Sequence, residues 1–205
     1  TTHSASILSA LLRHGMKPGY IDWIGMETVG QTSMPEKLWA GGLQGIWLGR
    51  ETARRLGHDL PVNGCYEFTA RTDRTLGEQR QAEFYVRDIL LSLAYGFERV
   101  SPGIIMDTGN AYYNTLWGAG GLCRRYPLLY PKRAYVGVAT ATRVLDRATF
   151  AGKHETGSRT VYALAFRRAD GREATALWTT VGEGEAEVAF DGTAEVETVG
   201  FLGAS

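Results

Sequence analysis

Three carboxylates stand at the expected ends of buried strands. Glu27 follows the run "YIDWIGM", Glu67 lies within "NGCYEFTARTD", and Asp107 follows "GIIM". A carboxylate can attack carbon, transfer a proton or bind a divalent cation, and its burial is costly unless it is paired, hydrogen-bonded or functional. Glu67 is flanked by Tyr66 and Phe68, and a purely structural role is hardest to assign there. We therefore expect Glu67 to carry chemistry.

The other two carboxylates have plausible structural roles. Gly109 and Asn110 follow Asp107 closely, and this composition favours a turn in which Asp107 bonds to its own main chain. For Glu27 a capping or salt-bridged role at the rim of the sheet is favoured over a functional one. Both remain candidates because three consecutive strands that end in carboxylates would bring acidic groups to one edge of a parallel sheet.

Helices and strands alternate along most of the chain. Short apolar runs predict strands over 20–30, 60–70 and 99–109. Helical spacing of apolar residues predicts helices over 4–14, within 34–59, over 75–97 (with Gly96 as the stop) and over 131–148. This order is typical of an α/β architecture with parallel strands and crossover helices.

The character changes after residue 150. Short alternating stretches are separated by "ADG", "GEG" and "DGT", and "RADGR" is a strong hairpin signal. We expect about four antiparallel strands here. The predicted domains are therefore 1–150, which is α/β, and 151–205, which is all-β.

Composition excludes several other classes of protein. Lys plus Arg and Asp plus Glu number 22 each, and this balance argues against a nucleic-acid partner. The two cysteines, Cys65 and Cys123, are too few for a disulfide framework and have no metal-ligand spacing, so two core thiols are expected. No apolar run is long enough for a membrane span. The "GAGG" at 118–121 lacks the strand before it and the helix after it that a nucleotide site needs, so no cofactor and no metal are expected.

The order of these stretches resembles that of clan A glycoside hydrolases. "LPVNGCYEF" followed by "GEQRQAEFYVRDILLSLAYG" is similar to their seventh strand and the helix after it. "LWGAGGLCRRYPLLYPKRAYVGVATATRVLDRATFAG" resembles the stretch leading out of their eighth strand, and "TVYALAFRRADGREATALWTT" the first hairpin of their appended β-sandwich. "YIDWIGMET" would be the sixth strand. The resemblance implies a partial (β/α)8 TIM barrel followed by an antiparallel β-sandwich segment.

By this resemblance Glu67 is the nucleophile of a retaining O-glycoside hydrolase that acts on a β-linked glycan or glycoside. The family carries its acid/base on the fourth strand, usually in an Asn-Glu pair, and a complete barrel takes about 250 residues. The resemblance thus implies a fragment, with the remaining strands supplied by the same longer polypeptide or by a partner chain. Clan members are often exported, which leaves a secreted or cell-surface location open.

The chain departs from the family pattern at three places. "GMETVGQ" lacks the usual His and Tyr of the sixth strand, and Met106 and Asp107 stand where the eighth strand commonly ends in a Trp. Tyr66 replaces the small residue before the nucleophile. The candidate substrate-binding residues beside Glu67 are Glu27, Tyr66, Asp107, Tyr112, Tyr113 and Trp117, the last three as a replacement for the missing Trp platform.

These departures leave two alternatives beside a carbohydrate-hydrolysing enzyme. One is a barrel of this lineage that has lost catalysis and serves as a carbohydrate-binding or structural module. The other is a non-hydrolytic α/β enzyme in which Glu27 and Asp107 converge with Glu67 on Mg²⁺ or Ca²⁺, which prefer clustered oxygen ligands.

Overall fold

The computed structural model describes residues 10–17, 20–31, 34–37, 50–51, 53–70, 77–108, 118–125, 128–189 and 195–204; of residues 26–31 it describes the main chain. The chain forms two compact units, Thr1–Val138 and Ala139–Ser205. The second unit thus begins within a helix, whereas the sequence changes character at residue 150. Gly203, near the C-terminus, lies close to Thr140 of that helix, which is consistent with the end of the helix belonging to the second unit.

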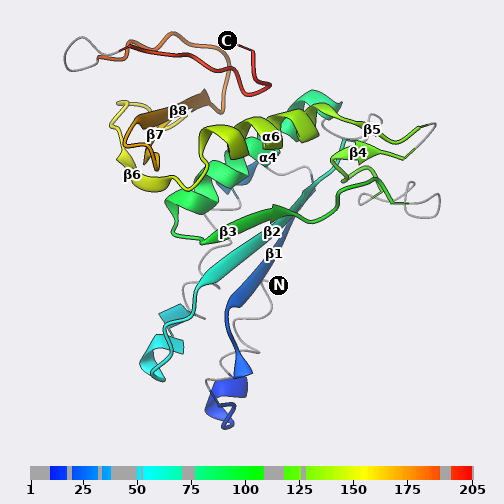
Figure 1. Ribbon diagram of the computed structural model, residues 1–205, viewed down its shortest axis with the longest axis vertical. Helices are drawn as coiled ribbons and strands as arrows, with labels where there is room; N and C mark the ends of the chain where they lie inside the picture. The colour runs from blue at the N-terminus through cyan, green and yellow to red at the C-terminus, as the bar shows by residue number, and fades with distance from the viewer. Residues whose placement is uncertain are drawn as a thin grey trace. The chain divides into compact units, whose positions relative to one another are not determined.

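A parallel sheet of three strands forms the centre of the first unit (Figure 1). Its order is β1 (Ile24–Gln31), β2 (Val62–Phe68) and β3 (Arg99–Pro102), with both neighbouring pairs parallel. Parallel neighbours need a crossover connection between them. The predicted order of strand, helix and strand is confirmed for β2, the helix α4 (Gly77–Ala94) and β3; much of the connection between β1 and β2 lies outside the described residues.

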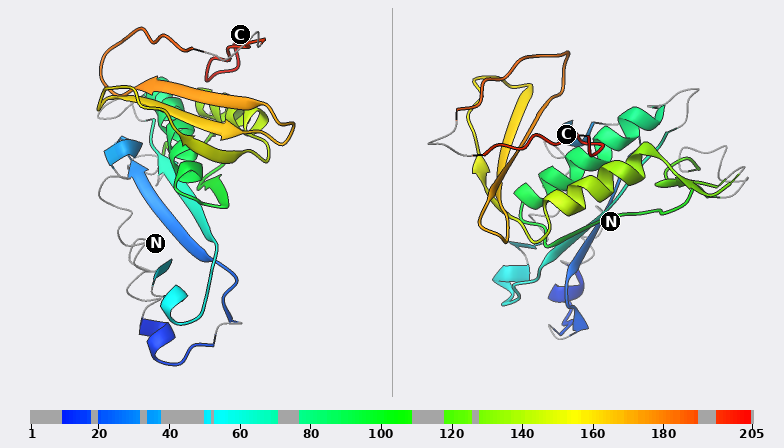
Figure 2. Two further views of the ribbon diagram at one scale, coloured as in Figure 1. Left: turned by 90° about the vertical axis from the view of Figure 1, so that its left-hand side faces the viewer. Right: turned by 45° about the horizontal axis from the view of Figure 1, so that its top comes forward.

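The crossover from β2 to β3 is the long helix α4 (Gly77–Ala94), which the sequence predicts over 75–97. Two residues after the end of the helix, Gly96 has a φ of +79°, and the N–H of Phe97 donates to the carbonyl of Ser92 at 3.0 Å. This is the left-handed ending that glycine adopts without a steric cost. Figures 1 and 2 show α4 lying along one face of β2 and β3.

Aromatic side chains fill the space between α4 and β2. Phe68 is fully buried, and its ring meets those of Phe84 and Tyr85 edge-on, with centroids 5.7 and 5.2 Å apart. Burial of each such ring contributes about 1.5–3 kcal/mol to folding, which makes this contact the main link between helix and strand.

The predicted third strand is shorter than expected. β3 ends at Pro102, although the sequence pattern extends to residue 109. Just beyond Pro102 the N–H of Gly103 still donates to the carbonyl of Tyr66 in β2 at 2.6 Å. From residue 104 onward the main chain pairs elsewhere: Leu122 donates to the carbonyl of Ile104 at 3.3 Å, and Cys123 donates to that of Ile105 at 2.8 Å. Cys123 belongs to β4 (Cys123–Arg124), which pairs with β5 (Tyr130–Pro131).

The second unit contains an antiparallel sheet of order β6 (Thr149–Lys153), β7 (Val161–Arg167) and β8 (Glu173–Thr179). It follows α6 (Arg133–Val144), which the sequence predicts over 131–148. The predicted "RADGR" hairpin joins β7 to β8, with Gly171 at a φ of +83°.

The expected fourth strand of this segment is wrong for the residues described. Residues 181–189 and 195–204 carry no strand, because this glutamate-rich stretch stays largely exposed and pairs with no other strand in the described residues. The two cysteines are free and half-buried. Among the described helices, none combines the length and the apolar character that crossing a membrane requires.

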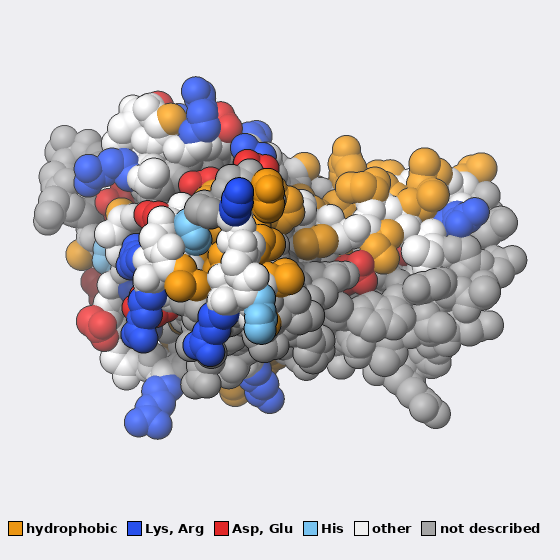
Figure 3. Space-filling model, turned by 90° about the horizontal axis from the view of Figure 1, so that it is seen from below, with side chains coloured by type: hydrophobic (Ala, Val, Ile, Leu, Met, Phe, Trp, Pro, Cys, Tyr) orange, Lys and Arg blue, Asp and Glu red, His pale blue; other side chains and the backbone are white. Residues whose placement is uncertain are grey.

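Large apolar side chains are exposed in the part of the first unit that carries β4 and β5. Figure 3 shows hydrophobic side chains gathered toward the right of the view, where these strands lie. The exposed residues of this part of the chain are Ile105, Met106, Leu128, Leu129 and Tyr130. A contiguous apolar surface of this kind is usually covered by another part of a protein or by a partner.

Candidate active site

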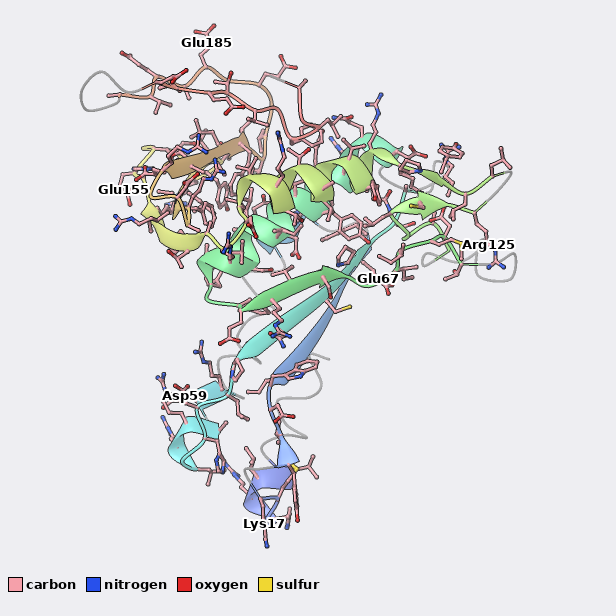
Figure 4. The ribbon with its side chains drawn as sticks, in the orientation of Figure 1. Lys17, Asp59, Glu67, Arg125, Glu155 and Glu185 are labelled. Atoms are coloured by element: carbon pink, nitrogen blue, oxygen red, sulfur yellow. The ribbon has the colours of Figure 1, made fainter. Side chains whose placement is uncertain are left out.

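Alternation along β2 separates the core from the candidate site. Val62, Gly64, Tyr66 and Phe68 are buried, whereas the intervening residues, Glu67 among them, are half-buried. The expected buried strand is thus fully buried only at every second residue of β2. Successive side chains of a strand point to opposite faces, so Glu67 lies on the face away from α4, at the carboxyl end of the central strand (Figure 4).

Tyr66 faces α4, on the side of the strand opposite to Glu67. Its hydroxyl accepts a hydrogen bond from Ser92 at 2.8 Å, and only 1% of the residue is exposed. Burial raises the pKa of this hydroxyl far above its ordinary value, with a further contribution from the nearby Asp88. The structure thus does not bring the Tyr66 side chain to the same face of the strand as Glu67.

The side chain of Glu67 lies against Gly103, the residue directly after β3. A Cβ atom at residue 103 would lie 2.6 Å from Cγ and 2.7 Å from Oε1 of Glu67. Only a glycine leaves that space open. The main chain at this point is also tightly joined, since the N–H of Gly103 donates to the carbonyl of Tyr66 at 2.6 Å.

The main chain of Phe68, directly after Glu67, is held by two side chains of α4. The Phe68 N–H donates to the hydroxyl of Tyr85 at 3.3 Å, and the Phe68 carbonyl accepts from Nε2 of Gln81 at 2.7 Å. Burial raises the pKa of the Tyr85 hydroxyl, and the charge of Glu67 acts in the same direction. Tyr85 therefore keeps its proton and can donate as well as accept.

The same two side chains also hold the segment 118–121, the "GAGG" of the sequence. Tyr85 donates to the carbonyl of Gly120 at 2.7 Å, and Gln81 donates to the carbonyl of Ala119 at 3.0 Å. The N–H of Ala70 donates to that Ala119 carbonyl as well, at 3.1 Å. The "GAGG" segment is thus bound to the chain just beyond the end of β2, and it has a structural role that the sequence alone does not reveal.

Asp107 is a buried ion-pair partner in this structure. Its Oδ1 accepts from Nζ of Lys132 at 2.5 Å and from the N–H of Gly121 at 3.0 Å. Burial raises the pKa of Asp107 and lowers that of Lys132, and the attraction between the two opposes both shifts. Lys132 also donates to the carbonyl of Ala119 at 3.0 Å. These contacts agree with the structural role that the sequence favours, although the partner is Lys132 and not a local turn.

The remaining predicted site residues are described in part or not at all. Glu27 lies within β1, which continues to Gln31, so it does not end its strand as expected. Its Cα pairs with that of Cys65, and Val29 pairs with Glu67; the Glu27 side chain lies outside the described atoms. Tyr112, Tyr113 and Trp117 also fall outside the described residues.

Metal binding finds no support in the described part of the chain, where no three His, Cys, Asp or Glu side chains converge as ligands. Asp107 has its Oδ1 engaged by Lys132 and Gly121, which leaves less of its carboxylate for a cation.

Sequence reasoning misses four residues of this site: Gln81, Tyr85, Gly103 and Lys132. The sequence offers one signal for Gln81, which lies on the apolar face of a predicted helix, one residue before Ala82. A glutamine is buried at such a position only if its side-chain amide is hydrogen-bonded. The Oε1 of Gln81 is buried and has no hydrogen-bond partner among the described residues, so the site uses the donor end of this amide.

No profile of a known family and no curated protein sequence matches this chain. Among solved structures, the chain is similar to a family 39 glycoside hydrolase from the gut symbiont Bacteroides cellulosilyticus WH2. The TM-score is 0.62 at 19% identity, over 86% of this chain and 37% of that enzyme. The chain therefore has a glycoside-hydrolase-like α/β fold and spans well under half of the length of the enzyme it resembles.

Proposed function

We propose that this chain is the C-terminal part of a retaining O-glycoside hydrolase that cleaves a β-linked glycan or glycoside, with Glu67 as the nucleophile. The single observation that carries the proposal is the position of Glu67: it is the last residue but one of the central strand of a parallel sheet, on the face that α4 does not cover. The likeness of the fold to a family 39 glycoside hydrolase supports the same class of enzyme.

In the proposed architecture β1, β2 and β3 are the sixth, seventh and eighth strands of a (β/α)8 barrel, and residues 151–205 begin a β-sandwich. In such barrels the helices form the outer ring, and catalytic side chains stand at the carboxyl ends of the strands. The face away from α4 would then be the interior, and Glu67 would stand at its mouth.

The edges of the sheet support a larger barrel. Within the described residues β1 pairs with β2 alone and β3 with β2 alone, so both outer strands have open edges. Open edges and exposed apolar residues are features that folded proteins cover. We propose that the remaining strands, from the same polypeptide or a partner chain, cover them and supply the acid/base.

The mechanism follows from the two carboxyl groups of a retaining glycosidase, which lie about 5 Å apart. The Glu67 carboxylate attacks the anomeric carbon while the acid/base protonates the departing glycosidic oxygen. The resulting glycosyl ester is attacked by water, whose proton goes to the acid/base, and Glu67 leaves as a carboxylate. Two inversions give a product of unchanged anomeric configuration.

The proposed contacts to the sugar, beside Glu67 itself, are Glu27, Tyr112, Tyr113 and Trp117. Tyr66 and Asp107 have structural roles. The Tyr66 hydroxyl accepts a hydrogen bond from Ser92 of α4, and Asp107 binds the segment 118–121 through the N–H of Gly121. The second candidate function is a module that binds carbohydrate without cleaving it. The missing His, Tyr and Trp of the family pattern favour it, and the placement of Glu67 opposes it.

A test uses the full-length gene product and a panel of aryl β-glycosides with a nitrophenyl leaving group, namely the glucoside, galactoside, xyloside and mannoside. We expect hydrolysis of at least one, with the β-anomer as the first product in proton NMR. Glu67→Gln should lower kcat by about 10³-fold or more, as loss of a group that acts only in the transition state does. The exposed Glu155→Gln is the matched control. Binding of a glycan without hydrolysis would instead favour the binding module.

A further inference from the structure

The carboxyl end of β2 is supported differently from the rest of the strand. Up to Tyr66, the main chain of β2 pairs with the main chain of β3 and of the residue after it. The last of these hydrogen bonds runs from the N–H of Gly103 to the carbonyl of Tyr66, at 2.6 Å. The N–H and carbonyl groups of residues two apart along a strand point toward the same neighbouring strand. Those of Phe68 therefore point in the same direction as those of Tyr66, but β3 has ended before it reaches them. Side chains of α4 take the place of a strand there.

Both main-chain groups of Phe68 are bonded by these side chains. Its N–H donates to the Tyr85 hydroxyl and its carbonyl accepts from Gln81, and all three residues are almost fully buried. A buried main-chain group without a partner costs about 1–3 kcal/mol. The main chain of the residue directly after Glu67 is therefore held by two buried side chains of one helix.

The support extends across the mouth of the sheet. Gln81 and Tyr85 donate to the carbonyls of Ala119 and Gly120, and Lys132 also donates to the Ala119 carbonyl. Gly121 packs on the main chain of Asp107, where a Cβ atom would lie 2.3 Å from the Asp107 nitrogen. The segment after Glu67 and the "GAGG" segment are thus fixed to each other through α4.

We propose that Gln81 and Tyr85 are positioning residues that fix Glu67 for attack by holding the main chain of Phe68. The proposal rests on the proposed function of Glu67 as nucleophile. Neither side chain touches substrate; each acts through the peptide on the far side of Glu67. A displacement of about 1 Å of a reacting group can cost about 100-fold in rate, so such support has a measurable value.

The variants separate this role from stability in general. Tyr85→Phe keeps the ring packing on Phe68 and removes the hydroxyl, and Gln81→Met keeps the length of the side chain and removes the amide. The matched control is Ser92→Ala, which removes a buried hydrogen bond between α4 and β2 that reaches Tyr66 and not Phe68.

The measurement is the rate constant of covalent inactivation of the full-length gene product by 2,4-dinitrophenyl 2-deoxy-2-fluoro-β-glycosides, at saturating inactivator. We expect Tyr85→Phe and Gln81→Met to lower this constant about tenfold or more. The half-saturating concentration should change little, and Ser92→Ala should react at the wild-type rate. An unfolded fraction lowers the amplitude of the reaction and not its rate constant, so a merely structural role would not produce this result.

Two outcomes would overturn the inference, and only the second would also overturn the proposed function. Labelling of both variants at the wild-type rate would show that Glu67 is positioned without them, and the proposed function would stand. Absence of labelling in the wild type, with every glycoside of the panel, would remove the proposed function and the inference with it. Amide hydrogen exchange gives a second readout, since Tyr85→Phe should speed exchange at Phe68 while Ser92→Ala should not.

Discussion

The side chain of Glu67 lies directly against Gly103, one residue beyond the end of β3. A Cβ atom at residue 103 would come within 2.6 Å of Cγ and 2.7 Å of Oε1 of Glu67. A carboxylate on β2 and the absence of a side chain just beyond β3 therefore define the position of the proposed nucleophile.

Gly103→Ala should displace Glu67 and leave the fold intact. The clash is with the movable end of a side chain, so the free energy of unfolding should change by about 1 kcal/mol or less. Activity on the responsive aryl glycoside should fall about tenfold or more, because the carboxylate loses its place. Gly152→Ala is the control, since nothing lies within 4 Å of a Cβ atom there. Full activity of Gly103→Ala would contradict the proposed position of Glu67.

Gly121→Ala should behave in the opposite way and destabilise the protein. A Cβ atom there would lie 2.3 Å from the Asp107 nitrogen and 2.4 Å from the Met106 carbonyl carbon, and both are main-chain atoms that have no rotamer to change. We expect a loss of about 3 kcal/mol, at the upper end of the cost of overpacking. Urea denaturation measures it, with Gly184→Ala as the comparison at an open position. Wild-type stability would show that the segment 118–121 is not packed as described.

Lys132→Met should destabilise the protein more than the double variant Asp107→Asn/Lys132→Met. Only 2% of each side chain is exposed in this ion pair, and removal of Lys132 leaves a buried carboxylate without its counter-charge. Breaking a buried pair in this way costs about 3–5 kcal/mol, whereas removal of both charges costs much less. A double-mutant cycle in urea gives the coupling between the two. A coupling near zero would mean that the pair is not formed.

The cost of Lys132→Met should depend on pH. Burial already raises the pKa of Asp107, and Lys132 opposes that rise; without Lys132 the pKa rises further. A carboxyl with a raised folded pKa contributes most stability below its unfolded pKa of about 3.9, and this contribution is lost as the pH rises toward the folded pKa. The difference in unfolding free energy between wild type and Lys132→Met should thus grow from pH 4 to pH 7. The same difference at both values would contradict the assignment, and the double variant should show no such growth.

The local part of the fold is readable in the sequence. The apolar spacing of 77–94 and Gly96 predict α4 and its end, and "RADGR" predicts the hairpin between β7 and β8. These features depend on residues within a few positions of one another. The end of β3 is not readable in this way, because whether the chain after Pro102 stays in the sheet depends on the segment 122–123, with which it pairs instead.

The candidate site also has a part that the sequence predicts and a part that depends on contacts between distant residues. Glu67 stands out in the sequence because a carboxylate between two aromatics has few structural roles. The partner of Asp107, by contrast, is Lys132, and the supports of Phe68 come from Gln81 and Tyr85. These contacts depend on how α4 and the segment 118–121 pack at the end of β2, and no spacing in the sequence encodes that arrangement.

The most direct test of Glu67 as nucleophile is the site of the covalent adduct. The full-length gene product is inactivated with the reactive 2-deoxy-2-fluoro glycoside, digested with trypsin and sequenced by mass spectrometry. We predict that the sugar is attached to the peptide 56–71, in which Asp59 and Glu67 are the only carboxylates, and that fragment ions place it on Glu67. Attachment to any other residue, or complete inactivation of Glu67→Gln at the wild-type rate, would contradict the proposed role of Glu67.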